Sequence, residues 1–249
     1  MDYSQILSQQ FNIKEEYAKN IITLLDDGNT IPFIARYRKE MHGSMDDQLI
    51  REFAEKLEYL RGLDKRRDEI RSLIDAQEKL TDEINLALDK AATLSELEDI
   101  YRPYRPKRKT RASIAKEKGL EPLANDILKQ EKGFDPSKSA VDYIDEEKGV
   151  TSVEDAIQGA MDIIAELVSD NAEIRKRIRN LTNANGVLVS VATDEEKDSV
   201  YKNYYDYKEP VKKIAGHRVL AVNRGEKEGF LKVSVETDSE KPLNSIFRA

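Results

Sequence analysis

The stretch SMDDQLIREFAEKLEYLRGLDKRRDEIRSLIDAQ, residues 44–77, predicts the longest element of the chain. Ser44 followed by Asp47 has the spacing of an acidic capping box at a helix N-terminus. Apolar residues then recur on one helix face along the whole segment: Leu49, Phe53, Leu57, Leu60, Leu63, Ile70 and Leu73. A helix of this length exceeds the usual globular range, so we expect it to bridge subdomains or to pair with another long helix.

Shorter helical patterns lie on both sides of this segment. Residues 12–28 read as an amphipathic helix that Asn12 caps and Gly28 ends, followed by a loop that carries Pro32. Ser95 with Glu98 forms a capping box for residues 95–101. Other helices are expected from capping or first-turn signals at Thr81, Thr110, Pro122, Ser152 and Asp170.

The residue pattern changes from helical to strand-like after Gly186. Residues 187–191, VLVSV, are a β-branched run, and residues 230–235, FLKVSV, alternate with a period of two, so both are expected to be strands. A tyrosine-rich segment and a short helix over 217–225 lie between them. The predicted fold class is therefore mainly α: a multi-helix assembly with one long central helix and a small β element of two short strands near the C-terminus.

Composition narrows the class of protein. The chain has 249 residues, a formal net charge of −7, no Cys and no Trp. Without Cys it has neither disulfides nor thiolate metal ligands, which fits a reducing compartment. The start is polar, and no apolar run approaches the roughly 18 residues that span a bilayer. We expect a cytoplasmic protein with no membrane partner.

The strongest basic cluster of this acidic chain is YRPYRPKRKTR, residues 101–111. Its cations can neutralise phosphates, and Tyr101 and Tyr104 can stack on bases. The residues predicted to bind nucleic acid are Arg102, Arg105, Lys107, Arg108, Lys109 and Arg111. The competing interpretation is structural: the arginines pair with the adjacent acids Glu96, Glu98 and Asp99, and the tyrosines pack beneath the loop.

Two further basic runs deserve the same comparison. The segment IARYRKE, 34–40, places Arg36, Arg38 and Lys39 beside Tyr37, and these three cations complete the predicted nucleic-acid contacts; contacts between helices explain the segment as easily. The run RKRIR, 175–179, is most simply a solvated helix face.

Catalytic motifs are missing from the sequence. It contains no GxxxxGK[ST] phosphate loop, no GxSxG elbow and no HExxH pair. Its two histidines, His42 and His217, are far apart in the chain, and no carboxylates cluster around either at helical spacing. We therefore expect no enzymatic activity, no cofactor and no metal site.

Several segments together resemble the N-terminal region of the bacterial Tex transcription accessory proteins. The resemblance covers nearly all of residues 1–236 and is carried by these stretches: TIPFIARYRKE at 30–40, LEYLRGLDKRRDEI at 57–70, ELEDIYRPYRPKRKTRASIAKEKGLEPLA at 96–124, SVEDAIQGAMDIIAE at 152–166 and YYDYKEPVKKIAGHRVLAVNRGEKEGFLKV at 204–233. Such ordered matches are far more specific than a single short motif.

The resemblance implies a larger protein than this chain. Tex-type proteins continue into an RNase H-like domain, helix-hairpin-helix units and a C-terminal OB-fold (S1) domain credited with most RNA binding. The chain is expected to be an N-terminal fragment without those modules. Expected divisions are an N-terminal helical region with a helix-turn-helix-like unit, the long helix and the basic loop (1–125), a helical continuation (126–185), and a small α/β segment leading toward the RNase H-like domain (186–249).

The expected function follows from the resemblance and the basic loop together. The chain would be the helical scaffold of a transcription accessory protein that binds RNA or DNA in its full-length form, mainly through the absent domains, with the transcription machinery as a further partner. The alternative is a protein-interaction module without nucleic-acid contact of its own. Salt-dependent binding separates the two, because only phosphate contacts release counterions.

Overall fold

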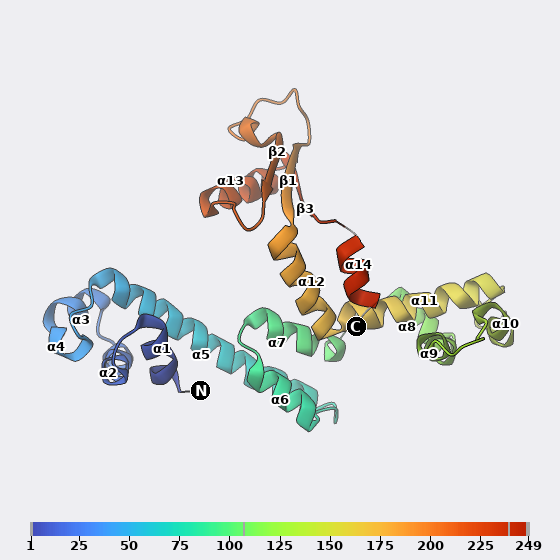
Figure 1. The fold of residues 1–249 in the computed structure, drawn as a ribbon, viewed down its shortest axis with the longest axis horizontal. Helices are drawn as coiled ribbons and strands as arrows, with labels where there is room; N and C mark the ends of the chain where they lie inside the picture. The colour runs from blue at the N-terminus through green and yellow to red at the C-terminus, as the bar shows by residue number, and fades with distance from the viewer. Residues whose placement is uncertain (1, 107, 239, 248–249) are drawn as a thin grey trace. The chain divides into compact units, whose positions relative to one another are not determined.

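The structure is a computed structural model that describes residues 2–106, 108–238 and 240–247. The chain forms two compact units, Met1–Tyr101 and Arg102–Ala249. The described residues are mainly helical, with one small antiparallel sheet near the C-terminus (Figure 1), so the predicted fold class is confirmed. The predicted divisions of the chain after residues 125 and 185 stay a prediction. No helix in the described ranges is both long enough and apolar enough to cross a membrane.

The first unit is built on one long helix, α5 (Asp47–Asp75). Figure 1 shows shorter helices gathered along it. They are α1 (Tyr3–Phe11), α2 (Glu15–Asp26), α3 (Ile31–Tyr37), α4 (Lys39–His42), α6 (Asp82–Lys90) and α7 (Leu94–Tyr101). Helices α1, α2 and α3, and later α6 and α7, contact α5. The long central helix is thus confirmed, and its partners are short helices.

The buried stripe of α5 was predicted correctly in its middle and wrongly at its ends. Leu73 is 43% exposed, and Leu49 is only half-buried. The neighbouring residues Ile50 and Ile74 are fully buried instead. One residue along a helix turns the side chain by about 100°, enough to leave the buried face. The buried face comprises Ile50, Phe53, Leu57, Leu60, Leu63, Arg67, Ile70 and Ile74.

Arg67 occupies a position of this stripe where an apolar side chain would be ordinary. It is 5% exposed. Its Nε donates to the carbonyl oxygen of Leu88 at 2.9 Å, and its Nη2 donates to that of Ala91 at 3.0 Å. The Asp64 carboxylate pairs with Nη1. Since the last carbonyls of a helix lack intrahelical partners, Arg67 satisfies the end of α6 and fixes it against α5.

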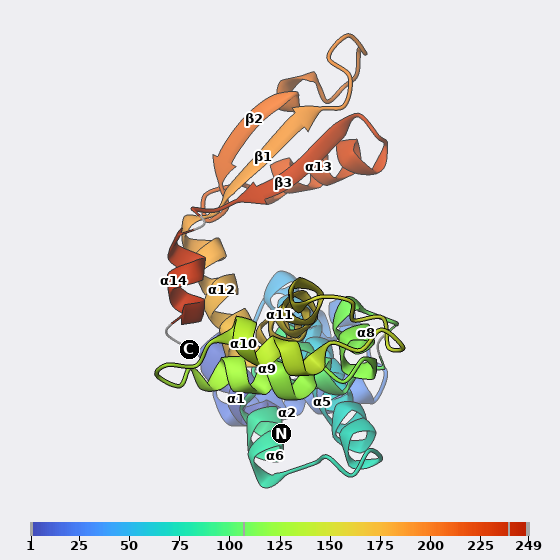
Figure 2. The ribbon, with the colours of Figure 1, turned by 90° about the vertical axis from the view of Figure 1, so that its right-hand side faces the viewer.

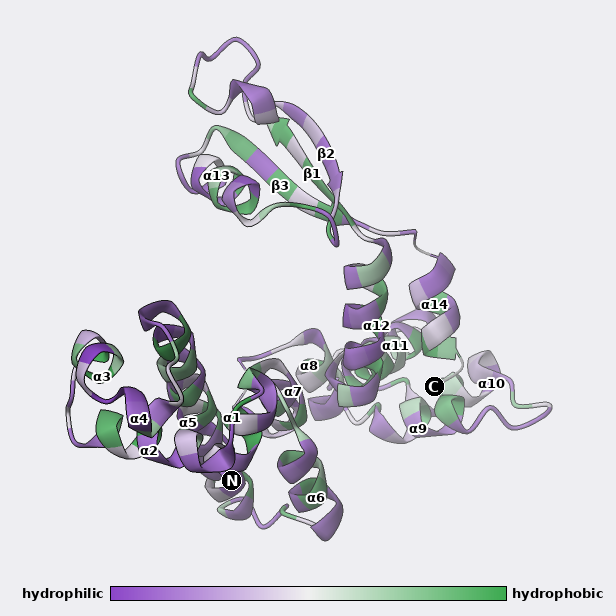
Figure 3. Cartoon of the chain, turned by 60° about the vertical axis from the view of Figure 1, so that its left-hand side comes forward, coloured by the Kyte–Doolittle hydropathy of each residue, from purple (hydrophilic) through white to green (hydrophobic). Residues whose placement is uncertain are grey.

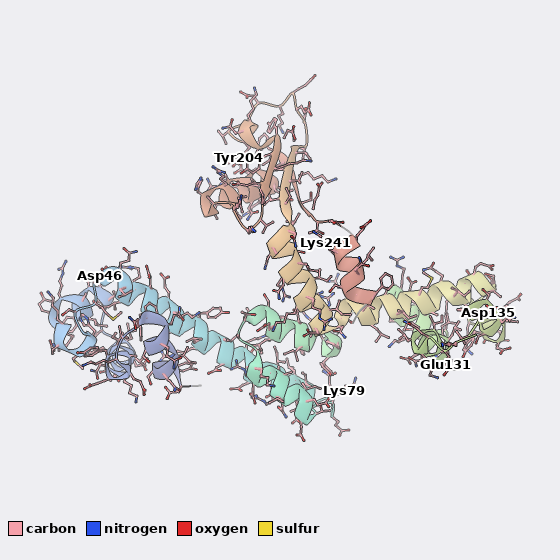
Figure 4. All side chains as sticks on the ribbon, viewed as in Figure 1. Asp46, Lys79, Glu131, Asp135, Tyr204 and Lys241 are labelled. Atoms are coloured by element: carbon pink, nitrogen blue, oxygen red, sulfur yellow. The ribbon has the colours of Figure 1, made fainter. Side chains whose placement is uncertain are left out.

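Two helix starts differ from the prediction. Asp46, labelled in Figure 4, caps α5 by accepting from the Leu49 amide at 2.7 Å, whereas Ser44 lies outside the helix at φ +63°. Asn12 does not begin α2. It ends α1 in the left-handed conformation at φ 52°, which Asn adopts more readily than most residues. The helix α1 itself, capped by Asp2, was not predicted.

The loop expected after residue 28 is largely helical. Most of residues 31–42 lie in α3 and α4. Pro32 is in the first turn of α3, where a missing amide donor costs little. The segment that carries Pro32 was expected to be a loop, and it is instead the start of a helix.

The second unit contains a helical cluster packed through small side chains. Its helices are α8 (Arg111–Glu117), α9 (Glu121–Lys129), α10 (Pro136–Ala140), α11 (Val153–Asp170), α12 (Ala172–Asn185), α13 (Gly216–Lys227) and α14 (Glu240–Phe247). Where α8 contacts α11, the buried residues are Ala112, Ala115, Ala156 and Ala160. Starts signalled by Thr110, Pro122 and Ser152 are confirmed. On α11, Ala160 is fully buried, whereas the next residue, Met161, is 54% exposed.

The sheet has three strands where two were predicted. Strands β1 (Val187–Ala192) and β3 (Leu231–Glu236) match the expected segments, and β2 (Asp206–Pro210) is additional. The order is β2-β1-β3, with both pairings antiparallel. Figure 3 colours β2 as mainly hydrophilic. An edge strand with exposed side chains carries little hydrophobic pattern, which is why the sequence did not predict β2.

Contacts on both sides of β1 fix this small sheet. Ser190 is fully buried, and its Oγ donates to the carbonyl oxygen of Tyr204 at 2.8 Å; Tyr204 is labelled in Figure 4. Helix α13 packs along β3, as Figure 2 shows. The predicted helix over 217–225 is confirmed within α13.

Replacing Gly43 by Ala is expected to destabilise the first unit more than replacing Gly28 by Ala. Both glycines have positive φ, +64° and +79°, which costs other residues roughly 1 kcal/mol. A Cβ on Gly43 would also lie 2.6 Å from the Tyr17 ring, whereas Gly28 has no atom within 4 Å. We expect losses of about 2–4 kcal/mol for Gly43→Ala and roughly 1 kcal/mol for Gly28→Ala. Urea denaturation measures both; equal losses would contradict the contact with Tyr17.

Candidate nucleic-acid interface

The basic loop runs from Arg102 to Arg111 and is attached to α11 near both of its ends. Its first residues form a 3-10 turn, Arg102–Tyr104. Arg102 Nε donates to Asp170 Oδ1 at 2.8 Å. Toward the other end, Thr110 Oγ1 donates to Glu166 Oε1 at 3.1 Å. Asp170 and Glu166 are one turn apart on α11, so one helix holds both ends of the loop.

Asp170 was predicted to cap α12, and this prediction is wrong. The cap is Asn171, whose side chain accepts from the Ile174 amide at 3.0 Å. Asp170 is the last residue of α11 and is 8% exposed. A carboxylate is unfavourable at a helix C-terminus and costly to bury without a partner. The Arg102 guanidinium is a partner of this carboxylate.

Thr110 fixes the start of the helix that follows the loop. Its Oγ1 accepts from the Ser113 amide at 3.0 Å, and Ser113 Oγ accepts in return from the Thr110 amide at 2.9 Å. This reciprocal capping box places Arg111 in the first turn of α8, on an exposed surface.

The described cations of the loop fall into two groups. Within the described ranges, Arg105, Arg108 and Arg111 are exposed and make no ion pair or side-chain hydrogen bond. Lys109 pairs with Glu117 at 3.3 Å, but both side chains are mostly exposed, and such surface pairs contribute little. Lys107, also predicted to bind nucleic acid, lies outside the described residues.

The two tyrosines of the motif do not offer open ring faces. Tyr101 is 6% exposed, and the Arg66 guanidinium lies 5.6 Å from its ring centroid. Tyr101 therefore belongs to the core of the first unit, and its predicted stacking on bases is wrong. Tyr104 is half-buried. Phosphate contact by cations is what the loop can provide.

The acids before the loop are used within the first unit. Arg66 Nε donates to Glu98 at 2.6 Å, so Glu98 is not the N-terminal capping residue that was predicted. Thr93 caps α7 instead, accepting from the Glu96 amide at 3.2 Å, and Glu96 accepts in return from the Ala92 amide at 2.8 Å.

A hollow beside α8 is lined by both cations and carboxylates. It has a volume of about 200 Å³ and is lined by Arg111, Lys118, Asp155 and Asp162 together with apolar residues. The hydrogen bond from the Thr151 hydroxyl, and the nearby Lys118 charge, lower the pKa of Asp155. This carboxylate stays ionised at neutral pH and disfavours a phosphate in the hollow. The acidic lining therefore makes this hollow an unfavourable place for a phosphate group.

The second predicted cluster lies in the first unit, at the junction of α3 and α4. Arg36 and Lys39 are exposed there. Arg38 is half-buried, with its guanidinium 5.1 Å from the Phe33 ring centroid. The predicted contacts therefore form two separate clusters, one in each unit.

The arginines at the two ends of the run 175–179 are half-buried, less exposed than the predicted solvated face. Arg175 is half-buried and donates to the carbonyl oxygen of Ser169 at 3.3 Å, whereas Arg177 is exposed and pairs with Glu173 at 3.1 Å. This run is tied to its own helices.

The histidines lie in unrelated surroundings. His42 is fully buried, and its Nε2 lies 3.1 Å from the carbonyl oxygen of Ile34. His217 is exposed in the first turn of α13. Within the described ranges no group of three or more His, Asp or Glu residues has the arrangement of a metal site.

Sequence reasoning missed the residues that hold the interface in place. Asp170 and Glu166 lie 68 and 56 residues from their partners Arg102 and Thr110. Nothing local marks an acid near a helix end as the anchor of a distant loop. Charge pairing between opposite signs was foreseeable, but the partner was not.

Two family models match the chain. The model described as Tex-like protein N-terminal domain matches residues 1–75, and the one described as Tex central region-like matches residues 131–248. The chain belongs to the Tex family. The resemblance proposed from the sequence motifs is thereby confirmed.

Relatives from bacteria and from an animal align along almost the whole chain. Protein YdcI of Bacillus subtilis is 45% identical over 247 residues, 96% of this chain and 34% of its own length. The transcriptional accessory protein Tex of Neisseria gonorrhoeae is 39% identical, with 95% and 31% covered. The human S1 RNA-binding domain-containing protein 1 is 31% identical, with 94% and 24% covered. The chain thus spans between a quarter and about a third of these curated relatives.

Replacing Arg102 by Ala is expected to destabilise the second unit, whereas replacing Arg105 by Ala is not. Without Arg102, the buried Asp170 carboxylate loses the hydrogen bond from the guanidinium, at a cost of roughly 1–3 kcal/mol. Arg105 has no side-chain partner among the described residues, so its removal should change the free energy of unfolding by less than about 0.5 kcal/mol. Urea denaturation of the two variants tests this difference. A similar loss from Arg105→Ala would mean that the loop needs all its cations for folding.

Proposed function

We propose that this chain is a nucleic-acid-binding helical scaffold of a transcription accessory protein, with the basic loop as its phosphate contact. The observation that carries the proposal is that Arg105, Arg108 and Arg111 are exposed without ion pairs in the described ranges, in a chain of net charge −7. Unneutralised cations on an anchored loop are suited to a polyanion, because binding releases counterions from phosphates. The names of two relatives, a transcriptional accessory protein and an S1 RNA-binding domain protein, support the same partner class.

The loop is suited to contact without base readout. Tyr104 of the loop is half-buried, and Tyr101 just before it is buried. Arginines that bind phosphates position a nucleic acid without reading its sequence. We therefore propose a scaffold that binds along the phosphate backbone of RNA or DNA, with the transcription machinery as a further partner. Base recognition would belong to other parts of a longer protein.

A binding role is also proposed in preference to a catalytic one. The two histidines lie in different units, one buried against a backbone carbonyl and one exposed. Neither has the paired groups that acid–base chemistry needs. The absence of Cys supports a cytoplasmic location as part of the same proposal.

The test is nucleic-acid binding by the chain as it stands. We expect Arg105→Ala/Arg108→Ala/Arg111→Ala to weaken binding of a labelled single-stranded RNA by about tenfold or more at low salt. The slope of log affinity against log salt should fall by about 2, because each lost single-strand phosphate contact removes roughly 0.7. Fluorescence anisotropy over a salt series measures both quantities, with duplex DNA as a second ligand.

A matched control removes the same charge elsewhere. Lys208, Lys212 and Lys213 are exposed in the second unit, and their replacement by Ala should leave the affinity within about twofold. Equal losses in both triple variants would indicate a general charge effect and overturn the assignment to the loop. No binding by the unmodified chain at low salt would favour the protein-interaction alternative.

A further inference from the structure

The end of α3 carries an exposed aromatic ring held from one side. Tyr37 is 63% exposed. Its ring centroid lies 5.4 Å from that of Phe33, with the planes tilted by 44°. Arg38 covers Phe33 at 5.1 Å and donates from Nη1 to the Tyr37 carbonyl oxygen at 3.1 Å. The neighbours thus support the Tyr37 side chain while most of its surface remains open to solvent.

Cations lie on both sides of Tyr37 in the sequence. Arg36 and Lys39 are exposed, and neither makes a side-chain hydrogen bond or ion pair within the described residues. With Arg38 they place three positive charges next to Tyr37 before the first acid, Glu40. Adjacent like charges repel one another, and a polyanion laid across them removes that repulsion. The cluster has both components of a nucleotide contact: a ring face and phosphate partners.

The combination favours a single strand over a duplex. Bases of a duplex are stacked on one another, so a protein ring can reach a base face only where the strand is unpaired. An aromatic side chain beside a cationic track is the usual platform for unpaired bases. We propose that Tyr37 stacks on a base of single-stranded nucleic acid while Arg36 and Lys39 bind the flanking phosphates. The choice of ligand rests on the proposed function, but the residues differ from those of the loop and lie in the other unit.

Tyr59, in the same unit, is an exposed tyrosine whose surroundings do not suit a nucleic acid. It is 42% exposed and also has a cation over its ring, Lys56 Nζ at 5.0 Å. However, it lines a hollow of about 580 Å³ together with Glu52 and Glu55. Two carboxylates beside the ring repel a phosphate backbone. An exposed tyrosine with a nearby cation is therefore insufficient, and Tyr59 serves as a matched control position.

The chain offers a direct optical test because it contains no Trp. In Tyr37→Trp, the introduced indole is the sole tryptophan, and stacking with a base should quench its emission saturably. The probes are short oligouridine, short oligothymidine, a duplex DNA and heparin. We expect loss of emission with both single strands, and none with heparin, which has charge but no bases. Tyr59→Trp should lose no emission with any probe. An unaltered far-UV circular dichroism spectrum confirms that each variant is folded.

Affinity variants complete the test. Tyr37→Ala should weaken oligouridine binding about tenfold, as expected for one lost stacking contact, whereas Tyr37→Phe keeps the ring and should bind as the unmodified chain does. Unchanged emission of Tyr37→Trp during binding that anisotropy detects would overturn this inference and leave the basic loop in place. Quenching that persists unchanged when Arg105, Arg108 and Arg111 are Ala would instead count against the loop. Binding by neither readout would remove the proposed function itself.

Discussion

The basic loop exists as a loop because one helix holds both of its ends. Asp170 binds Arg102 and Glu166 binds Thr110, and a single helical turn separates the two acids by about 6 Å along the axis. An extended segment from 102 to 110 would span roughly 27 Å. With its ends held so close together, the segment cannot be fully extended. Pro103 and Pro106 disfavour a continuous α-helix across the segment, which begins with the 3-10 turn Arg102–Tyr104. Arg105 and Arg108 lie within this closed segment and are exposed.

The same anchoring depends on how closely α8 approaches α11. The buried residues of the two helices include Ala112 and Ala115 on α8 and Ala156 and Ala160 on α11. Gly159 leaves room for the Leu120 side chain, which would lie 2.3 Å from a Cβ there. Small residues let the two helix backbones come close, so Thr110 at the start of α8 can reach Glu166. The loop is thus positioned by apolar packing, and its ion pairs act on a geometry that packing has already set.

Much of the helical pattern was predictable because periodicity and capping chemistry are local. The ends of the helices were harder to predict, and the wrong capping residues share one cause. Asp170 and Asn171 are both good capping residues, yet Asp170 pairs with Arg102 and leaves the cap to Asn171. Ser95 and Thr93 compete in the same way, and the capping box fails at Ser95 because Glu98 binds Arg66. A choice between equivalent neighbours is made by distant partners, which a local pattern does not contain.

The candidate site illustrates this limit for charge. From the sequence, Arg102 and Arg105 are equivalent cations, one directly before Pro103 and the other directly after Tyr104. In the fold, Arg102 is committed to a buried carboxylate, whereas Arg105 has no partner among the described residues. Arg67 is the extreme case, because its buried guanidinium donates to the carbonyl oxygens at the end of a helix. A cation already paired with a buried acid must break that pair before it can bind a phosphate, while an unpaired one gives up only water and counterions. Nucleic-acid affinity should therefore follow the unpaired cations, Arg36, Lys39, Arg105, Arg108 and Arg111, and not the density of basic letters in the sequence.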